Sequence, residues 1–240
     1  MDVIEAPSPN FGPRTKGPPH MLVLHYTGMR GGEAALARLR DPASQVSAHY
    51  MVEEDGRIFR LVPEARRAWH AGKSSWRGET DVNSASIGVE IVNPGHEFGY
   101  RPFPELQVAA VLALVGDIRS RWTIEDVDII GHADVAPDRK EDPGELFPWK
   151  RLAEAGHGLW AEPPAAPGAP LAEGEESAAV FALQAGFTRL GYDCAPDGKF
   201  DAHTAAVVRA FQRHWRQARV DGVADGETRA RLIALLRLIG

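Results

Sequence analysis

The chain has 240 residues, of which 44% are hydrophobic and 25% are charged, a balance typical of a folded globular protein. Its formal net charge of −6 argues against a nucleic-acid-binding protein that relies on a generally basic surface. Apolar runs such as residues 108–115 are too short to span a bilayer, so no transmembrane segment is expected. A single cysteine cannot form an internal disulfide, which leaves the nine histidines as the most informative feature.

The first two thirds of the chain alternate between predicted strands and predicted helices. Short runs rich in β-branched and aromatic residues predict strands at 20–27, 47–55, 57–63, 86–93 and 127–134. Apolar residues spaced three and four apart predict helices at 32–41 and 104–122. Because the turn EEDGR at 53–57 favours an antiparallel hairpin, we expect an α/β domain with a mixed β-sheet flanked by helices.

A change in composition separates this region from the rest of the chain. Residues 161–174 are rich in Pro, Ala and Gly and are typical of a semi-extended linker. The pattern therefore predicts one domain over 1–160 and a second over 175–240. The second has three helical segments, of which the first ends at Gly191 and the third begins behind Asp225, so a small all-α three-helix domain is expected.

Two histidines lie at or near the ends of predicted strands, where binding sites are commonly built. His25 precedes a Tyr-Thr-Gly turn, His132 follows the apolar run VDII, and Asp142 lies ten residues after His132 in a polar loop. Two imidazoles and one carboxylate match the ligands of an open catalytic zinc site. Spacing alone leaves an alternative, because histidines at strand ends often only bind backbone groups.

Two charged residues near these positions are candidates for catalysis. Glu90 interrupts the apolar strand SIGVEIVN, so it either faces a polar cavity, as a general base would, or lies on a solvent-exposed strand face. Lys140 precedes Asp142 by two residues and so projects to the same side of an extended loop. It then either stabilises an oxyanion or is an ordinary solvated lysine.

Five motifs in order give these residues a context: LVLHYTG, SAHYMVEEDG, AWHAG, SIGVEIVN and GHADVAPDRKEDPGELFPW. Together they closely resemble the zinc-dependent N-acetylmuramoyl-L-alanine amidases of the AmpD and AmiD type, which are related to peptidoglycan recognition proteins. The resemblance covers about residues 18–155. Any one motif would be weak on its own, but five in the same order make the resemblance specific.

The resemblance implies a role for each candidate. His25, His132 and Asp142 correspond to the Zn²⁺ ligands, Glu90 to the catalytic acid/base, and Lys140 to the residue that stabilises the transition state. Non-catalytic members of the wider family commonly lack a metal ligand, so this intact set favours an enzyme.

Other aromatic side chains lie within or near the same motifs. His49, Trp69 and His70 are candidates for contact with the glycan or the stem peptide, although structural hydrogen bonding is an equal alternative for the two histidines. Trp76 could stack on a sugar or be buried. His20, His157, His203 and His214 have no motif around them and are expected at the surface.

The second domain resembles three-helix peptidoglycan-binding modules through LQAGFTRLGY, DGKFDAHTAAVVRAFQRHW and VDGVADGETRARL. It departs from that pattern at Asp201, where glycine is frequent, and at residues 218–220, where Gly-Leu is expected. An alternative is a helical module that merely packs on the first domain.

The expected activity is hydrolysis of the amide between the lactyl group of N-acetylmuramic acid and L-alanine, in peptidoglycan or anhydro-muropeptides. The alternatives are a wall-binding protein with little or no catalysis, and a cysteine peptidase, which the position of Cys194 outside every motif argues against. No Sec signal peptide is visible in the sequence, yet a wall-binding module favours the cell envelope over the cytoplasm.

Overall fold

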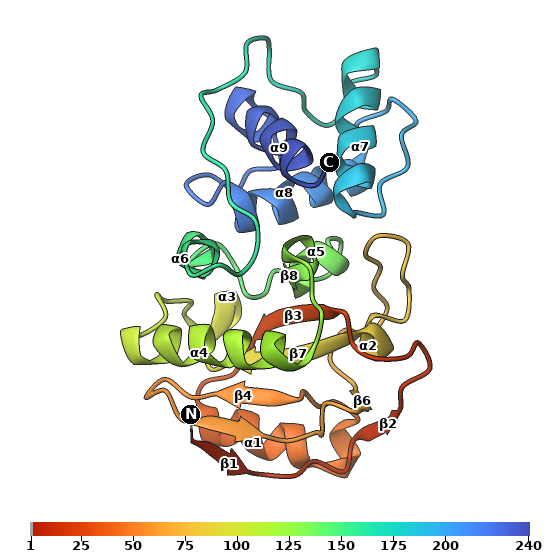
Figure 1. Cartoon of the computed structure of the whole chain (residues 1–240). Coiled ribbons are helices and arrows are strands. Elements are labelled where there is room, and N and C mark those ends of the chain that lie inside the picture. Colours follow the sequence, from red (N-terminus) through yellow and green to blue (C-terminus); the bar gives the residue numbers. More distant parts are fainter. Residues whose placement is uncertain (1) are drawn as a thin grey trace.

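The computed structural model describes residues 2–240 and has a mixed β-sheet in its lower half, with the C-terminal helices above it (Figure 1). Six strands lie in the order β1-β5-β4-β7-β3-β8, and β2 pairs separately with β6. The strands are β1 (Val3–Glu5), β2 (Phe11–Pro13), β3 (Met21–Tyr26), β4 (Tyr50–Val52), β5 (Ile58–Arg60), β6 (Arg66–Ala68), β7 (Ser86–Ile91) and β8 (Ile129–Gly131). All five predicted strands are present, β4 and β5 form the predicted antiparallel hairpin, and the mixed α/β fold is confirmed.

Helices flank the sheet and make up the C-terminal region. They are α1 (Gly32–Arg40), α2 (Val82–Ala85), α3 (Gly95–Phe98), α4 (Glu105–Arg121), α5 (His132–Val135), α6 (Trp149–Glu154), α7 (Ala178–Leu190), α8 (Ala202–Trp215) and α9 (Gly226–Leu238). The two helices predicted in the first domain and the three predicted in the second are confirmed. The strand predicted at 127–134 is wrong beyond Gly131, because Asp134 accepts a hydrogen bond from the Gly131 amide and α5 begins there.

The two faces of the sheet are covered in different ways. Leu24 of β3 and Val89 of β7 lie on one face, where they belong to one buried cluster with side chains of α4 and α6. His25 and Glu90 alternate with them and so lie on the opposite face. On that face α1 packs with Met51 at one side, and the cluster around Val23 continues into the C-terminal helices at the other. A cleft that His25 and Glu90 line lies between these two packed regions.

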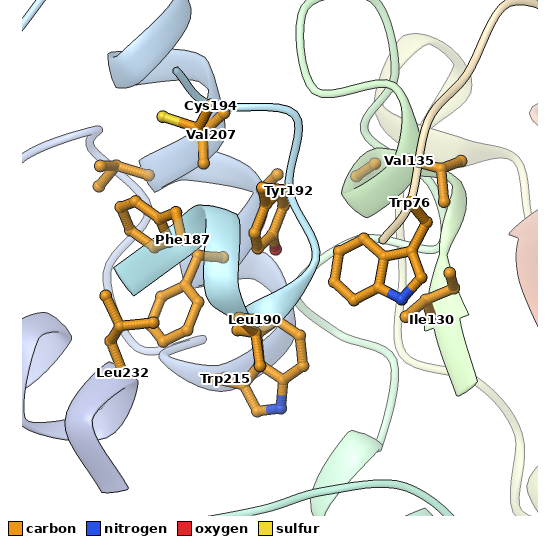
Figure 2. Close-up of a cluster of buried hydrophobic side chains, with 14 of the residues drawn as sticks. Trp76, Ile130, Val135, Phe187, Leu190, Tyr192, Cys194, Val207, Trp215 and Leu232 are labelled. Atoms are coloured by element: carbon orange, nitrogen blue, oxygen red, sulfur yellow. The ribbon is translucent and has the colours of Figure 1, made fainter. Parts of the chain in front are cut away.

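The C-terminal helices share a hydrophobic core with the sheet (Figure 2). The rings of Trp76 and Tyr192 meet edge to face with their centroids 5.1 Å apart, and the Arg77 amide donates to the Gly191 carbonyl over 2.7 Å. Trp76, for which sugar stacking was one alternative, is completely buried in this contact. One continuous apolar cluster therefore joins the two parts of the chain.

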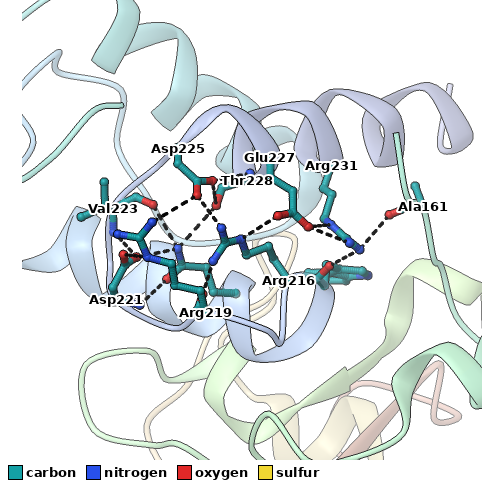
Figure 3. Close-up of polar contacts among 11 residues, drawn as sticks. Ala161, Arg216, Arg219, Asp221, Val223, Asp225, Glu227, Thr228 and Arg231 are labelled. Carbon is teal, nitrogen blue, oxygen red and sulfur yellow. Dashed lines mark hydrogen bonds and ion pairs between the residues drawn. The ribbon is translucent and has the colours of Figure 1, made fainter. Parts of the chain in front are cut away.

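Polar contacts also tie the start of the predicted linker to these helices (Figure 3). Arg231 of α9 donates to the carbonyl oxygens of Trp215 and Ala161 over 2.6 and 3.1 Å. Arg216, directly after α8, forms an ion pair of 2.5 Å with Asp225, the residue that caps α9. The three-helix region is thus held together internally and to the chain that enters it.

Across residues 2–240, none of the helices combines the length and the apolar character needed to traverse a bilayer.

Candidate metal centre

Three parallel strands bring the predicted ligands to one edge of the sheet. β3 lies between β7 and β8, and His25 is paired in register with Glu90. His132 is the first residue after β8. The loop that follows turns back, because the Ala133 amide donates to the Asp142 carbonyl over 2.9 Å. Carboxyl ends of parallel strands are where α/β proteins commonly bind ligands.

Three ligand atoms form a small triangle at this edge. His25 Nδ1 lies 3.0 Å from His132 Nδ1 and 3.0 Å from Asp142 Oδ2, and the latter two atoms are 3.1 Å apart. All three residues are buried. Tetrahedral zinc with bonds of roughly 2.0–2.1 Å to nitrogen and oxygen separates its ligand atoms by about 3.3 Å, so the triangle fits a zinc-sized ion.

The hydrogen bonds around His132 and His25 leave both Nδ1 atoms free to bind a cation. His132 Nε2 lies 3.1 Å from the Ala71 carbonyl, which can only accept, so Nε2 carries the proton. For His25, the Ser86 hydroxyl donates to the Val82 carbonyl and accepts from His70 Nε2. His70 Nδ1 is then an acceptor, and His25 Nε2 donates to it over 3.0 Å. This outer ring of partners orients both ligands, as in other metal sites.

The protonation of the cluster agrees with a cation-binding role. Burial lowers the pKa of His25 to about 4, and His132 adds to this effect. Burial also lowers the pKa of His70 well below its usual range, with His25 contributing. Although burial alone would raise the pKa of Asp142, His132 and His25 hold it below its usual range. Near neutral pH, His25 is therefore a neutral imidazole facing an ionised carboxylate.

Glu90 faces this centre with an unsatisfied oxygen. Its Oε2 atom is buried and has no hydrogen-bond partner within residues 2–240. Burial raises the pKa of Glu90 well above its usual range, Asp142 raises it further, and Lys140 opposes the shift. A buried carboxylate with a raised pKa beside a cluster of polar groups is a candidate for general acid–base catalysis.

A cleft of about 420 Å³ opens over these groups. Glu90 and Lys140 line it together with the three ligand residues, and residues of α1 line it as well. Trp69 and His70 also line the cleft, so both remain candidates for contact with a ligand.

His49 lies outside the cleft. It is completely buried, its Nδ1 accepts from the Gly88 amide over 2.9 Å, and its Nε2 lies 3.0 Å from the Arg66 carbonyl. These contacts tie His49 to the backbones of β7 and β6, and they leave no surface of His49 for a ligand. The expectation that His49 touches substrate is therefore not retained.

Two residues of the cleft were not identified from the sequence, and the burial of another histidine, His214, differs from the expectation. His96 and Arg139 line the cleft, and Arg139 Nε donates to the Lys73 carbonyl over 3.0 Å. The place of His96, shortly after β7, is the same strand-end signal that identified His25. The expectation that His214 lies at the surface is wrong: it is buried, because its ring stacks on Trp149 and Trp215 and its Nδ1 donates to Asp134. Burial raises the pKa of the Cys194 thiol to about 12, which makes that residue a poor nucleophile.

A larger hollow of about 880 Å³ lies at the opposite edge of the sheet, around Met21 and Asp128. These residues lie at the amino-terminal ends of β3 and β8. Within residues 2–240, His25, His132 and Asp142 form the one group of three His, Cys, Asp or Glu side chains whose ligand atoms lie close enough to share an ion. Size alone is therefore a poor guide to the site in this protein.

Comparison with known families and proteins gives one consistent result. A family model described as N-acetylmuramoyl-L-alanine amidase matches residues 15–145, and a model described as a putative peptidoglycan binding domain matches residues 176–232. The chain is 39% identical to N-acetylmuramoyl-L-alanine amidase AmiD of Escherichia coli K12, over 92% of this chain and 83% of that protein.

Solved structures of similar proteins cover both regions. AmiD from E. coli, in complex with the substrate anhydro-N-acetylmuramic acid-L-Ala-D-γ-Glu-L-Lys, superposes with a TM-score of 0.81 at 38% identity, covering 94% of this chain and 92% of that chain. AmpDh3 from Pseudomonas aeruginosa, in complex with an anhydromuramic pentapeptide, superposes with a TM-score of 0.77 at 32% identity, covering 97% of this chain and 95% of that one.

Proposed function

Since this chain belongs to the N-acetylmuramoyl-L-alanine amidase family, we propose that it is a zinc hydrolase that cleaves the amide between the lactyl group of N-acetylmuramic acid and L-alanine. The observation that carries this proposal is the triangle of His25 Nδ1, His132 Nδ1 and Asp142 Oδ2, with sides of 3.0–3.1 Å, beneath a cleft that Glu90 also lines. A zinc ion held by these three side chains would keep one coordination position open for water or substrate.

Each polar group of the cleft has a task in this reaction. When bound, zinc polarises the scissile carbonyl and lowers the pKa of the attacking water. Glu90 takes the proton of that water and later transfers it to the leaving amine of L-alanine. The ammonium of Lys140 stabilises the negative charge that develops on the carbonyl oxygen. Trp69 and His70 contact the sugar or the stem peptide from the cleft wall.

The two regions of the chain then have separate tasks. Residues 1–160 form the catalytic domain, 161–174 connect the regions, and 175–240 hold peptidoglycan. The substrates are peptidoglycan or anhydro-muropeptides. The similar structures that contain anhydro-muropeptide ligands support the second of these.

Product analysis tests this proposal directly. The zinc-loaded full chain is incubated with defined muropeptides, with and without the anhydro ring, and the products are weighed by mass spectrometry. We expect a free stem peptide beginning with L-alanine and an intact sugar, no product after chelation, and recovery when zinc is returned. Binding of muropeptide without any release of peptide would instead support a non-catalytic wall-binding protein.

A further inference from the structure

We propose that α8 and the segment around it position the metal ligands, so that the C-terminal helices are part of the metal site and not only a wall-binding module. Residues 131–147 carry His132, Lys140 and Asp142 and are named here the ligand loop. This role rests on the proposed function, because His132 and Asp142 matter here as ligands of zinc. Beyond α5 the ligand loop contains no regular secondary structure until α6 begins, so other parts of the chain must hold it in place.

The most deeply buried of these contacts is made at Asp134, two residues after His132. Asp134 is only 2% exposed, and such a buried carboxylate requires hydrogen-bond donors. Its Oδ1 accepts from the Tyr192 hydroxyl over 2.5 Å, and its Oδ2 accepts from His214 Nδ1 over 2.8 Å and from the Gly131 amide over 2.8 Å. Two of these three donors belong to the C-terminal helical region.

The ring of His214 is itself held in one orientation. It stacks between Trp149 of α6 and Trp215 of α8, with centroid distances of 3.6 Å on both sides and interplanar angles of 23° and 6°. This stack fixes the direction in which Nδ1 points. His214, 80 positions after Asp134, therefore helps to hold α5 in place, and with it His132.

α8 and the residues just after it also contact the ligand loop before, between and after Lys140 and Asp142. His203 Nδ1 lies 2.9 Å from the Asp138 carboxylate, and Arg213 donates to Glu141 over 2.6 Å. Just after α8, Gln217 Nε2 donates to the carbonyl oxygens of Glu145 and Phe147 over 2.6 and 2.7 Å. Because the Ala133 amide binds the Asp142 carbonyl, a shift of α5 would also displace Asp142.

These contacts give the three ligands unequal support. His25 is held by the hydrogen bonds of β3 to two neighbouring strands, whereas His132 and Asp142 depend on a loop that α8 and Tyr192 brace. Loosening this brace would let two of the three ligand atoms spread apart. The affinity for zinc should then fall, because partners outside the ligand shell typically contribute about 10- to 100-fold in metal affinity.

Replacing Tyr192 by Phe tests this role, with Tyr50→Phe as the matched control. Both tyrosines are buried, and each donates to a carboxylate, Tyr192 to Asp134 and Tyr50 to Glu64 over 2.8 Å. Glu64 does not line the cleft. Zinc affinity of the full chain is measured by competition with a chelator of known affinity. We expect Tyr192→Phe to weaken binding about 10- to 100-fold and Tyr50→Phe to leave it within about twofold.

A second measurement needs no metal. In the metal-free chain, hydrogen–deuterium exchange of peptides covering the ligand loop should be faster in Tyr192→Phe and unchanged in Tyr50→Phe. Gln217→Ala, which removes two contacts from a partly exposed side chain, should have the same effect near Glu145. Replacing His214 by Asn, which keeps a donor, should retain more zinc affinity than His214→Ala.

The outcomes separate this role from the proposed function. If Tyr192→Phe and Gln217→Ala bind zinc as tightly as the unchanged protein and exchange at the same rate, the positioning role is wrong. Equal weakening by Tyr50→Phe would also overturn it, because the effect would then be general loosening. If the unchanged protein binds no zinc, the proposed function fails, while faster exchange confined to the ligand loop would still support the bracing of that loop by α8.

Discussion

The two faces of the six-stranded sheet are buried by different elements of the chain. One face is covered by α4 and α6, whose side chains form a single apolar cluster with Leu24, Val89 and their neighbours. The other face is shared by α1 and the C-terminal helices, and the gap between them holds His25 and Glu90. The difference indicates that the first face supplies stability alone, whereas the second also supplies a site whose geometry depends on distant segments.

Glu90→Gln should produce the largest effect on turnover while leaving the metal in place. A glutamine keeps the shape of the side chain but cannot accept the proton of the attacking water, so kcat should fall by about 10²- to 10⁴-fold. Metal content by elemental analysis should remain stoichiometric. Asp142→Ala is the contrasting variant, since it removes a ligand and should lose metal and activity together. An active Glu90→Gln would remove Glu90 from the mechanism.

Lys140→Met should lower kcat by about 10²-fold, because one stabiliser of the developing oxyanion is lost. Methionine has a similar length and no charge, so the shape of the cleft is largely retained. Zinc affinity should change little, since Lys140 is not a ligand. Steady-state kinetics on a defined muropeptide would show whether the loss is in kcat, as expected, or only in KM, which would assign Lys140 to substrate binding.

Two identical substitutions on opposite faces test the contrast between them. Leu114→Ala in α4 and Leu190→Ala in α7 each remove a completely buried side chain, and each should lower the free energy of unfolding by about 2–5 kcal/mol. Only Leu190→Ala should also weaken zinc binding, because its cluster includes Tyr192. Urea unfolding and chelator competition measure the two effects. Equal zinc affinity in both variants would show that the faces do not differ in this respect.

The smallest effect is expected at the exposed ion pair of His203 and Asp138. Burial alone would lower the pKa of His203, but contacts with the Asp193 carbonyl and the Asp138 carboxylate outweigh it and raise the pKa. A raised pKa in the folded state stabilises the protein below the unfolded value of about 6.5, and this stabilisation is lost as pH rises through the folded pKa.

His203→Ala should therefore lower the free energy of unfolding by up to about 1 kcal/mol at pH 5.5, and by less at pH 8.5. Urea unfolding of both proteins at the two pH values measures this difference. A penalty that grows with pH would contradict the assignment of a protonated His203.

Local patterns in the sequence were enough to predict much of the fold. Val207, Phe211 and Trp215 are spaced by four residues and all are buried on one face of α8. The alternation of Val89, Glu90 and Ile91 likewise predicts Glu90 on the strand face away from Val89 and Ile91. Such periodicity depends only on the geometry of one helix or strand, so it can be recognised without knowing what packs against the element.

Part of the candidate site could be predicted from local sequence patterns in the same way. His25 and His132 were recognised at strand ends, and the structure brings them together with Asp142 because β3 and β8 are parallel neighbours. The roles of His49 and Trp76 could not be predicted from the sequence, because the burial of a side chain depends on the segments that surround it. His49 binds the backbones of β7 and β6, and Trp76 packs against Tyr192.

By itself the sequence determined the strands, the principal helices, the candidate ligands and the resemblance to zinc amidases, since all of these are encoded in short segments. Only the tertiary structure decided that the C-terminal helices share a core with the sheet and that His214 lies beside Asp134. These two residues are 80 positions apart, and the sequence around either one does not predict a contact with the other. Contacts of this kind arise when complete elements pack, because a buried carboxylate is stable only where the assembled fold supplies its donors.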